Sequence, residues 1–248
     1  MNRFKPALSL VLLAGAALLG LASAEKKTGT APTGIAVVEL FTSEGCSSCP
    51  PADEALAAAD KAYTGHVYVL GFHVDYWDRL GWKDPFSNAS WTDRQNRYAE
   101  KFKITSIYTP QAVVNGTTQF TGSEKNRLFA TIEKELKQTP GAAPEISATM
   151  GSDKNIHVSY KTVAAPGRVL NIALVQRNAD TQVKRGENEG KLLHHINIVR
   201  GLSTSTAASG ELRFRLPDGM TPAGCLIIAF VQDKGTLAIT AAAEAAIR

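Results

Sequence analysis

The chain is poor in cysteine, with only three in 248 residues. Two of them form one Cys46-Ser47-Ser48-Cys49 motif. Without a second such pair, the sequence does not offer the four thiolates of a structural zinc site. The chain also lacks the spacing of a serine triad, a phosphate-binding loop or a catalytic pair of carboxylates. These absences leave the isolated CxxC motif as the main chemical feature.

A strong excess of one charge is also missing, as is any long apolar run beyond the first residues. Arg3 and Lys5 precede an apolar stretch at 8–21, and Ala22-Ser23-Ala24 follows as a small-residue cleavage site. Residues 1–24 are therefore predicted to be a secretory signal peptide. The alternative is an uncleaved anchor, but the stretch is short for a span of ~20 residues. No cysteine lies near the cleavage site, which argues against a lipoprotein.

The mature chain is expected to be nearly neutral. Without Arg3 and Lys5, 25 of the 27 basic residues remain against 23 acidic ones, a net charge of +2. No basic stripe is present, so a nucleic-acid partner is not expected. We expect a secreted protein, in the periplasm, with no membrane span after signal cleavage. In that compartment a CxxC pair is more often a redox pair or a clip than a zinc ligand set.

The first half of the chain alternates predicted strands with predicted helices. Asn115-Gly116, between two β-type runs, predicts a hairpin with a two-residue turn. Near-continuous apolar runs are typical of strands buried on both faces. Strands are expected at 35–41 and 66–74, with a hairpin of two strands at 108–120. Helices are expected at 50–61, from Ser90 onward and at 123–138. The predicted order is therefore β-α-β-α-β-β-α.

The second half shows a different pattern. Residues 139–144 (TPGAAP) are interpreted as a linker. Several short alternating strands follow without helices between them, which predicts an antiparallel β-sandwich. The tail after residue 236 fits two interpretations, a last strand of the sandwich or, in its alanine run, a helix. Cys225 lies in an apolar strand and is expected to be a buried, inert thiol.

The CxxC motif lies between the first strand and the first helix. Proline at position 50 is tolerated in a first helical turn, and the partial positive charge of a helix N-terminus favours a thiolate. We expect Cys46 to lie exposed before the helix and to attack a partner disulfide. Cys49, one turn inside and more buried, would resolve the mixed disulfide. A static clip is the structural alternative, although so short a loop restrains little chain entropy.

Several stretches resemble an uncharacterised family of secreted bacterial proteins, a domain-of-unknown-function family within the thioredoxin-like superfamily. The resemblance implies an α/β fold with a thioredoxin-like domain at 34–138 and a smaller antiparallel β-sandwich-like domain at 144–241. It implies no particular reaction, because that family has none assigned. The matching stretches are Glu39–Asp53 (ELFTSEGCSSCPPAD), Phe72–Asp78, Tyr108–Gln111 and Asn197–Arg200.

The resemblance also implies a role for Pro110. In thioredoxin-like proteins the equivalent proline is cis and faces the CxxC pair, and Thr109 precedes it here. From the residues alone, a trans proline at the start of an edge strand is the alternative. Gly45 stands where thioredoxin has a tryptophan, and Ser47-Ser48 replaces its Gly-Pro. Neither a reducing nor an oxidising role therefore follows from the resemblance.

Other residues are candidates to flank the thiols. The carboxyl ends of parallel strands share one edge of a sheet, which brings Asp75 and Trp77 toward the motif. Glu44, two residues before Cys46, is either a proton relay or a solvated loop residue. His73 lies in an apolar run and is expected to be an interior histidine.

Two features in the second half of the chain are possible sites of binding or catalysis. Adjacent residues on a strand point to opposite faces, so His194 and His195 are not expected to bind one metal ion. Residues 186–190 (GENEG) are expected to form a flexible loop, with Glu187 and Glu189 in a solvated turn.

The sequence thus predicts an exported thiol–disulfide oxidoreductase that exchanges disulfides with envelope proteins. Its catalytic residues would be Cys46, Cys49 and Pro110, its substrate contacts Thr109, Asp75, Trp77 and Glu44, and no cofactor or metal is expected. One alternative is a copper-binding or delivery protein, because paired thiols also bind Cu(I), with His73 as a candidate third ligand. The other is a non-enzymatic envelope binding module with a permanent disulfide.

Overall fold

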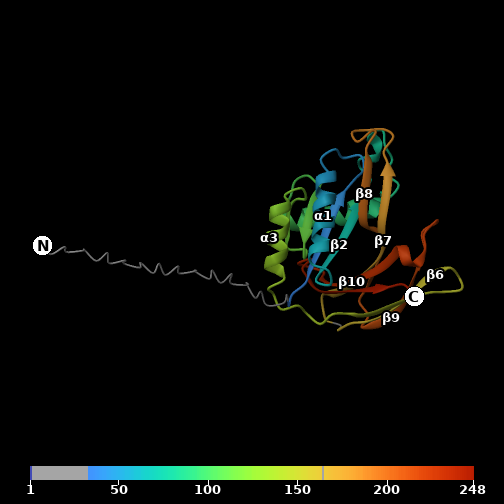
Figure 1. The fold of residues 1–248 in the computed structure, drawn as a ribbon. Helices are drawn as coiled ribbons and strands as arrows, with labels where there is room; N and C mark the ends of the chain where they lie inside the picture. Colours follow the sequence, from blue (N-terminus) through green and yellow to red (C-terminus); the bar gives the residue numbers. More distant parts are fainter. Residues whose placement is uncertain (2–32, 164) are drawn as a thin grey trace. The chain divides into compact units, whose positions relative to one another are not determined.

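The computed structural model describes Met1 and residues 33–163 and 165–248. The predicted signal peptide at 1–24, apart from Met1, lies outside the described residues. The residues from 33 onward belong to a single unit, shown in Figure 1. Within the described residues, no helix is long and apolar enough to cross a membrane.

An eight-stranded mixed sheet runs through this unit, in the order β11-β10-β7-β8-β2-β1-β3-β4. β1 (Ala36–Thr42) and β2 (Val67–His73) pair in parallel. β3 (Gln111–Val114) runs antiparallel to β1, and β4 (Thr118–Thr121) runs antiparallel to β3. Every residue of β1 and β2 is buried, as expected of apolar strands covered on both faces.

Helices cover both faces of these four strands. α1 (Pro50–Ala62) and α3 (Lys125–Glu135) pack against one set of alternate β1 and β2 side chains. Figure 1 shows them together on one side of the sheet. α2 (Ala89–Phe102) packs Trp91 and Tyr98 against the opposite face. The predicted order β-α-β-α-β-β-α is confirmed for residues 36–135.

Two features predicted from local sequence signals, the start of a helix and the length of a turn, differ slightly from those in the structure. α2 begins at Ala89 because Asn88 caps it, with its Oδ1 accepting a hydrogen bond from Ser90 N at 2.9 Å. In the β3–β4 hairpin, Asn115 and Gly116 adopt φ of 46° and 66°. Val114 pairs with Thr118, however, so the turn has three residues rather than the expected two.

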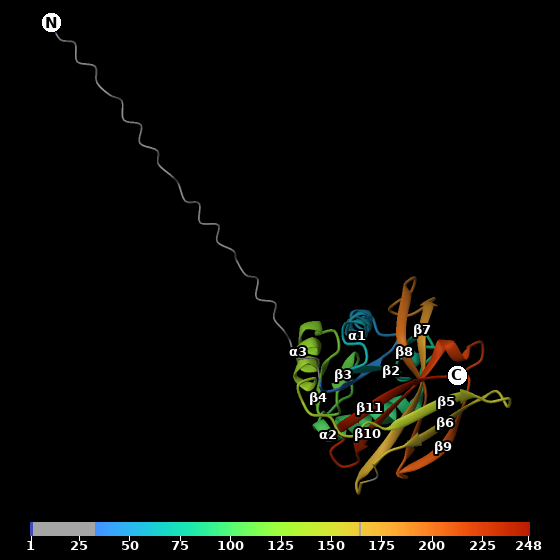
Figure 2. The same ribbon diagram turned by 60° about the horizontal axis from the view of Figure 1, so that its bottom comes forward.

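The second half of the chain contributes to two sheets. Four of its strands extend the large sheet, and β8 joins β2 by parallel pairing at Gly71 and Ile198. The other three form a small antiparallel sheet that packs on β7 and β10 through apolar side chains; Figure 2 shows this small sheet beside β10 and β11. The strands are β5 (Glu145–Met150), β6 (Asn155–Lys161), β7 (Arg168–Gln182), β8 (Leu192–Ser205), β9 (Ser209–Arg215), β10 (Cys225–Asp233) and β11 (Ile239–Ala246). Short 3₁₀ turns occur at Asp78–Leu80 and Pro222–Gly224.

The alanine run is a strand, so the helical interpretation of the tail is wrong. β11 pairs along β10 from Ala246 opposite Leu226 to Ile239 opposite Gln232. Alanine favours helices only as a weak prior, and pairing with a buried neighbour overrides it. The expected α/β class is confirmed as a mixed α/β fold with a smaller antiparallel sheet. The domain bounds 34–138 and 144–241 stay predictions, and strands from both ranges meet in one sheet where β2 pairs with β8.

Candidate functional site

A disulfide joins Cys46 and Cys49 directly after β1. Cys49 is the N-cap of α1, and its carbonyl oxygen accepts hydrogen bonds from Ala52 N at 2.8 Å and Asp53 N at 3.1 Å. Cys46 lies in the preceding turn, where its carbonyl oxygen accepts from Cys49 N at 3.2 Å. The pair is thus at the helix N-terminus, as predicted. Cys49 is at the N-cap rather than one turn inside, because the helix begins only at Pro50.

Both cysteine side chains are sealed from solvent. The exposed fraction is 0% for Cys46 and 0% for Cys49, whereas Ser47 and Ser48 between them are exposed. The expectation that Cys46 is accessible is therefore wrong for this structure. The main chain around Cys46 is contacted by a loop far along the chain, the one that connects β7 to β8.

This loop, residues 183–191, is called the cap. Asn188 is fully buried at its centre, and its Nδ2 donates to the carbonyl oxygens of Glu44 and Cys46, both at 2.9 Å. The Glu187 carboxylate accepts a hydrogen bond from Ser47 N at 3.0 Å, which lowers the pKa of Glu187. Glu187 and Glu189 are exposed, as predicted, whereas Asn188 between them is buried. The peptide groups around Cys46 take their partners from Asn188 and Glu187.

Hydrogen bonds within the cap fix its conformation. Val183 N donates to Lys191 O, Gly190 N donates to Val183 O, and Lys191 Nζ donates to Asn188 Oδ1, each at 2.9 Å. Gly186 and Gly190 both adopt φ of +81°, a conformation that glycine tolerates best. The cap is therefore a defined turn that presents Asn188 to the disulfide loop.

A cluster of buried titratable side chains adjoins the disulfide loop. Glu44 is 0% exposed, its Oε2 accepts from Trp82 Nε1 at 2.7 Å, and its Oε1 lies 3.3 Å from His195 Nε2. His195 Nδ1 lies 3.9 Å from Asp53 Oδ2. Among the described residues, neither ring nitrogen of His195 makes a directed hydrogen bond. Burial raises the pKa of Asp53 to about 7, against the opposing charge of His195.

His73 extends this cluster. Its Nδ1 lies 2.7 Å from Asp84 Oδ2, which also accepts from Glu44 N at 2.8 Å. Burial raises the pKa of Asp84, but the charge and hydrogen bond of His73 and the backbone N–H donors lower it overall. The rings of His73 and His195 meet edge to face at 4.8 Å. His73 is thus an interior histidine with a partner, as predicted.

Trp77 and Thr109 meet beside the disulfide loop. Trp77 Nε1 donates to Thr109 Oγ1 at 2.8 Å, and Trp77 Cβ lies 3.2 Å from the place where a Cβ on Gly45 would stand. The Thr109–Pro110 bond is cis, as the resemblance implied. That Pro110 faces the CxxC pair stays a prediction. The roles of these residues stay predictions.

Pro110 lies beside the first turn of α1. A Cβ added to Gly122 would stand 3.4 Å from Pro110 Cβ and 3.1 Å from Ala52 Cβ. Asp75 is directed elsewhere, because its Oδ1 accepts from Thr92 Oγ1, in α2, at 2.6 Å. The structure therefore brings Glu44, Trp77 and Thr109 to the disulfide loop, places Pro110 near Ala52 of α1, and joins Asp75 to α2.

Sequence reasoning missed the residues that close the site. Asn188 lies 142 residues after Cys46, and no local pattern links them. His195 carried a usable signal, because strand alternation predicts opposite faces for it and His194. That prediction is confirmed: His194 is exposed beside Asp180, and His195 is buried.

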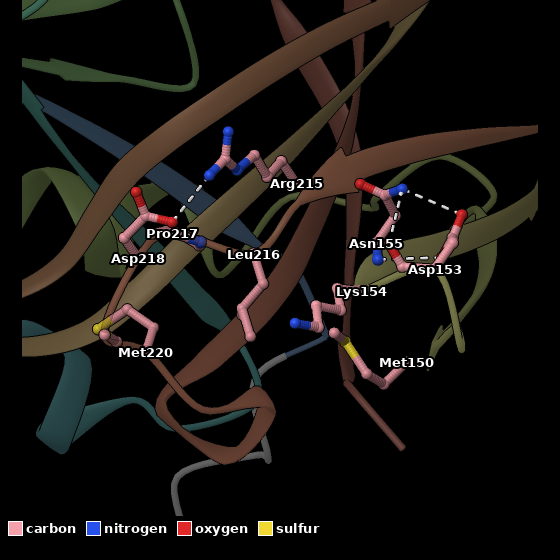
Figure 3. A pocket seen from close by; sticks show the side chains of 10 residues that line it. Met150, Asp153, Lys154, Asn155, Arg215, Leu216, Pro217, Asp218 and Met220 are labelled. Carbon is pink, nitrogen blue, oxygen red and sulfur yellow. Dashed lines mark hydrogen bonds and ion pairs between the residues drawn. The ribbon is translucent and has the colours of Figure 1, made fainter.

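A surface hollow of about 510 Å³ lies away from this site. Its lining residues come from β5, β6 and β9 and from the turns next to them, as Figure 3 shows. Arg215 Nη2 donates to Asp218 Oδ1 at 3.0 Å, and Asn155 Nδ2 donates to Asp153 Oδ2 at 3.0 Å. These polar groups pair with one another, so the hollow offers no chemistry comparable with that of the disulfide.

Comparisons with known proteins assign the chain to a family but assign it no reaction. A family model described as a protein of unknown function (DUF1223) matches residues 37–232. A structural-genomics target protein from Agrobacterium tumefaciens is similar in structure, with a TM-score of 0.64 and 26% identity over 84% of this chain and 92% of that one. A domain of the outer membrane lipoprotein Omp28 from Porphyromonas gingivalis covers 43% of this chain and 94% of its own, at 14% identity and a TM-score of only 0.27. No curated relative matches the chain.

Proposed function

The chain belongs to the DUF1223 family, and from that premise we propose that it exchanges disulfides with envelope proteins through Cys46 and Cys49. The observation that carries the proposal is a disulfide at the N-terminus of α1 between residues only three apart. So short a loop adds little stability by restraining the unfolded chain. A helix N-terminus, in contrast, favours the thiolate that exchange requires.

A thioredoxin-like domain at 34–138 is part of this proposal. Its support is the strand order β2-β1-β3-β4 with β1 and β2 parallel and β3 antiparallel to β1. Helices on both faces and a CxxC pair between β1 and α1 add to it. Thr109 and Pro110 would then contact an extended partner segment, next to Trp77. Export to the periplasm is also proposed, on the signal-like residues 1–24.

The exchange step is written from the oxidised pair. A partner thiolate attacks Sγ of Cys46, a new S–S bond forms, and the Cys46–Cys49 bond breaks with its electron pair leaving on Cys49. The Cys49 thiolate takes up a proton. A second partner thiolate then attacks the partner sulfur of the mixed disulfide, and Cys46 leaves as a thiolate. Two electrons pass from the partner dithiol to the pair, and the reverse sequence reduces a partner disulfide.

Asp53 supports the proton transfers that accompany this step. It lies one turn beyond Cys49 in α1, with a side chain 13% exposed. Burial raises its pKa to about 7. Near neutral pH it is therefore present in both forms, and can give or accept a proton while the pair is reduced or oxidised.

Two cysteine variants test the proposal. Purified mature protein is mixed with a reduced dithiol peptide, and its disulfide transfer is followed by mass spectrometry after acid quenching. We expect transfer by wild-type protein and none by Cys46→Ser. When a disulfide-bonded peptide replaces the dithiol, the free Cys46 thiolate of Cys49→Ser should attack it and form a mixed disulfide, while the other peptide sulfur leaves as a thiolate. Cys225→Ser serves as the control and should behave as wild type. The proposal is lost if wild-type protein transfers no disulfide to the peptide.

One observation favours a second candidate, the binding module with a permanent disulfide. The complete burial of Cys46 and Cys49 is what a structural bond would show. A reduction potential below about −300 mV would support this candidate, because such bonds resist ordinary exchange. The copper-delivery alternative asked for a third ligand such as His73 near the thiols; among the described residues no group of three or more His, Cys, Asp or Glu side chains could hold a metal ion, so no observation favours it.

A further inference from the structure

The cap closes over the disulfide with polar groups rather than with an apolar core. Residues 184–191 (KRGENEGK) contain no large apolar side chain, and Val183 before them is buried at 1% exposure. The hydrogen bonds that close it on the disulfide loop are the two Asn188 bonds and the Glu187 bond, and Gly186 packs beside Trp82. Water can replace each of these hydrogen bonds once the loop lifts, and little apolar surface becomes exposed.

The cap is carried at the end of a two-stranded ribbon. β8 pairs with β7 from Ser205 to Leu192, but it pairs with β2 only at Ile198. In Figure 1 β7 and β8 run side by side and end in the loop at the top of the view. Movement of the cap itself, beyond Gln182 and Leu192, leaves the pairing of β1 and β2 and the buried position of His195 on β8 unchanged.

The main-chain groups that bond to the cap indicate what kind of partner could take its place. Lifting the cap frees the N–H of Ser47 and the carbonyl oxygens of Glu44 and Cys46. These are one donor and two acceptors on a single stretch of main chain. An extended polypeptide offers matching C=O and N–H groups along its length, whereas a small thiol does not.

We infer that the cap is a self-inhibitory latch, in which Asn188 and Glu187 occupy the main-chain groups that an extended partner polypeptide must take over. This inference rests on the proposed exchange function and adds its regulation. With the cap closed, both sulfurs are inaccessible. Displacement of Asn188 by the partner uncovers them, so that docking and exposure of the disulfide are one event.

Asn188→Asp tests the latch with an almost isosteric change. The substitution replaces the donating Nδ2 by an acceptor oxygen that faces two carbonyl oxygens, and so repels where wild type binds. The measurement is the rate constant for reduction of the Cys46–Cys49 disulfide by dithiothreitol under native conditions, with alkylation after denaturation. We expect reduction to be about tenfold faster, equivalent to ~1.4 kcal/mol of lost closing free energy.

Two further variants complete the design. Asn178→Asp makes the same change at an exposed site on β7 and should leave the reduction rate unchanged. Glu187→Ala removes one exposed side chain and its single bond to Ser47, so it should accelerate reduction without threatening the fold. Faster hydrogen exchange of the Ser47 amide in this variant would report the open cap directly.

The outcomes separate the latch from the exchange function. The latch is wrong if both cap variants, folded as judged by circular dichroism, are reduced at the wild-type rate. It is supported if both are faster. If they are faster yet fail to transfer a disulfide to the dithiol peptide, the latch stands and the exchange function is lost.

Discussion

The surroundings of the Asp53 carboxyl group disfavour its ionised form. Burial raises its pKa from 3.8 to about 7. Between these two values the unfolded chain releases the proton while the folded protein keeps it, so stability falls as pH rises through this window. At ~1.4 kcal/mol for each pH unit, the full loss is at most ~4 kcal/mol.

Asp53→Asn should remove this loss. We expect the difference in unfolding free energy between variant and wild type to grow in favour of the variant by up to ~4 kcal/mol from pH 4 to pH 8. Urea titrations at both pH values measure it. Asp93→Asn, at an exposed position on α2, is the control and should show little such growth. An equal effect of Asp53→Asn at both pH values would contradict the prediction.

At the scale of elements, the turn between β3 and β4 holds three parts of the fold together. Asn115 Oδ1 accepts from Val37 N at 2.7 Å. Asn115 Nδ2 donates to Ile35 O at 3.1 Å and to Glu135 at 2.9 Å. One side chain therefore connects β1, the turn and α3, at a backbone φ of 46° that few residues other than glycine adopt readily.

Asn115→Ala should cost ~2–4 kcal/mol of unfolding free energy, because it leaves buried backbone groups without partners and keeps the left-handed conformation. Thr117→Ala, at an exposed position of the same turn, should stay within ~0.5 kcal/mol of wild type. Guanidinium titration gives both values. If Asn115→Gly, which removes only the backbone penalty, restored wild-type stability, the three hydrogen bonds would not matter.

The elements that sequence could predict are those whose signal is local. The apolar runs at 36–42 and 67–73, and the proline at position 50, identify strands and a helix start without reference to the rest of the chain. The candidate site could be predicted only in part. Cys46, Trp77 and Thr109 were found, but Asn188 and His195 reach the site through strands that meet β2 at one residue pair. No local pattern encodes such a contact.

At the scale of the whole molecule, a hydrogen-bonded network around a buried ion pair connects the two halves of the chain. Arg94 donates to both carboxylate oxygens of Glu39, and Nη2 lies 2.8 Å from Oε1. Tyr98 OH donates to the same carboxylate at 2.5 Å, and Gln232 Nε2 donates to Tyr98 OH at 2.9 Å. Glu39 lies on β1 and Gln232 on β10, so the network spans the large sheet.

Arg94→Met should destabilise the whole unit by ~3–5 kcal/mol, because it leaves a buried carboxylate uncompensated. All three tryptophans lie between residues 77 and 91, whereas most strands lie after residue 144. Tryptophan fluorescence therefore reports the first half, whereas far-ultraviolet circular dichroism at the β-strand minimum includes the strands of the second half. We expect the unfolding midpoints of both signals to shift by the same denaturant concentration. Combining Arg94→Met with Glu39→Gln should regain much of the loss. Separate shifts of the two signals would contradict the coupling.

The burial of every cysteine has a practical consequence. Cys225 is 1% exposed on β10, and burial raises the pKa of its thiol; the motif pair is closed beneath the cap. Alkylating reagents applied to intact cells will therefore leave Cys225 and the oxidised pair of this protein unmarked. Proteome-wide inventories of reactive thiols will pass it over unless the chain is unfolded before labelling.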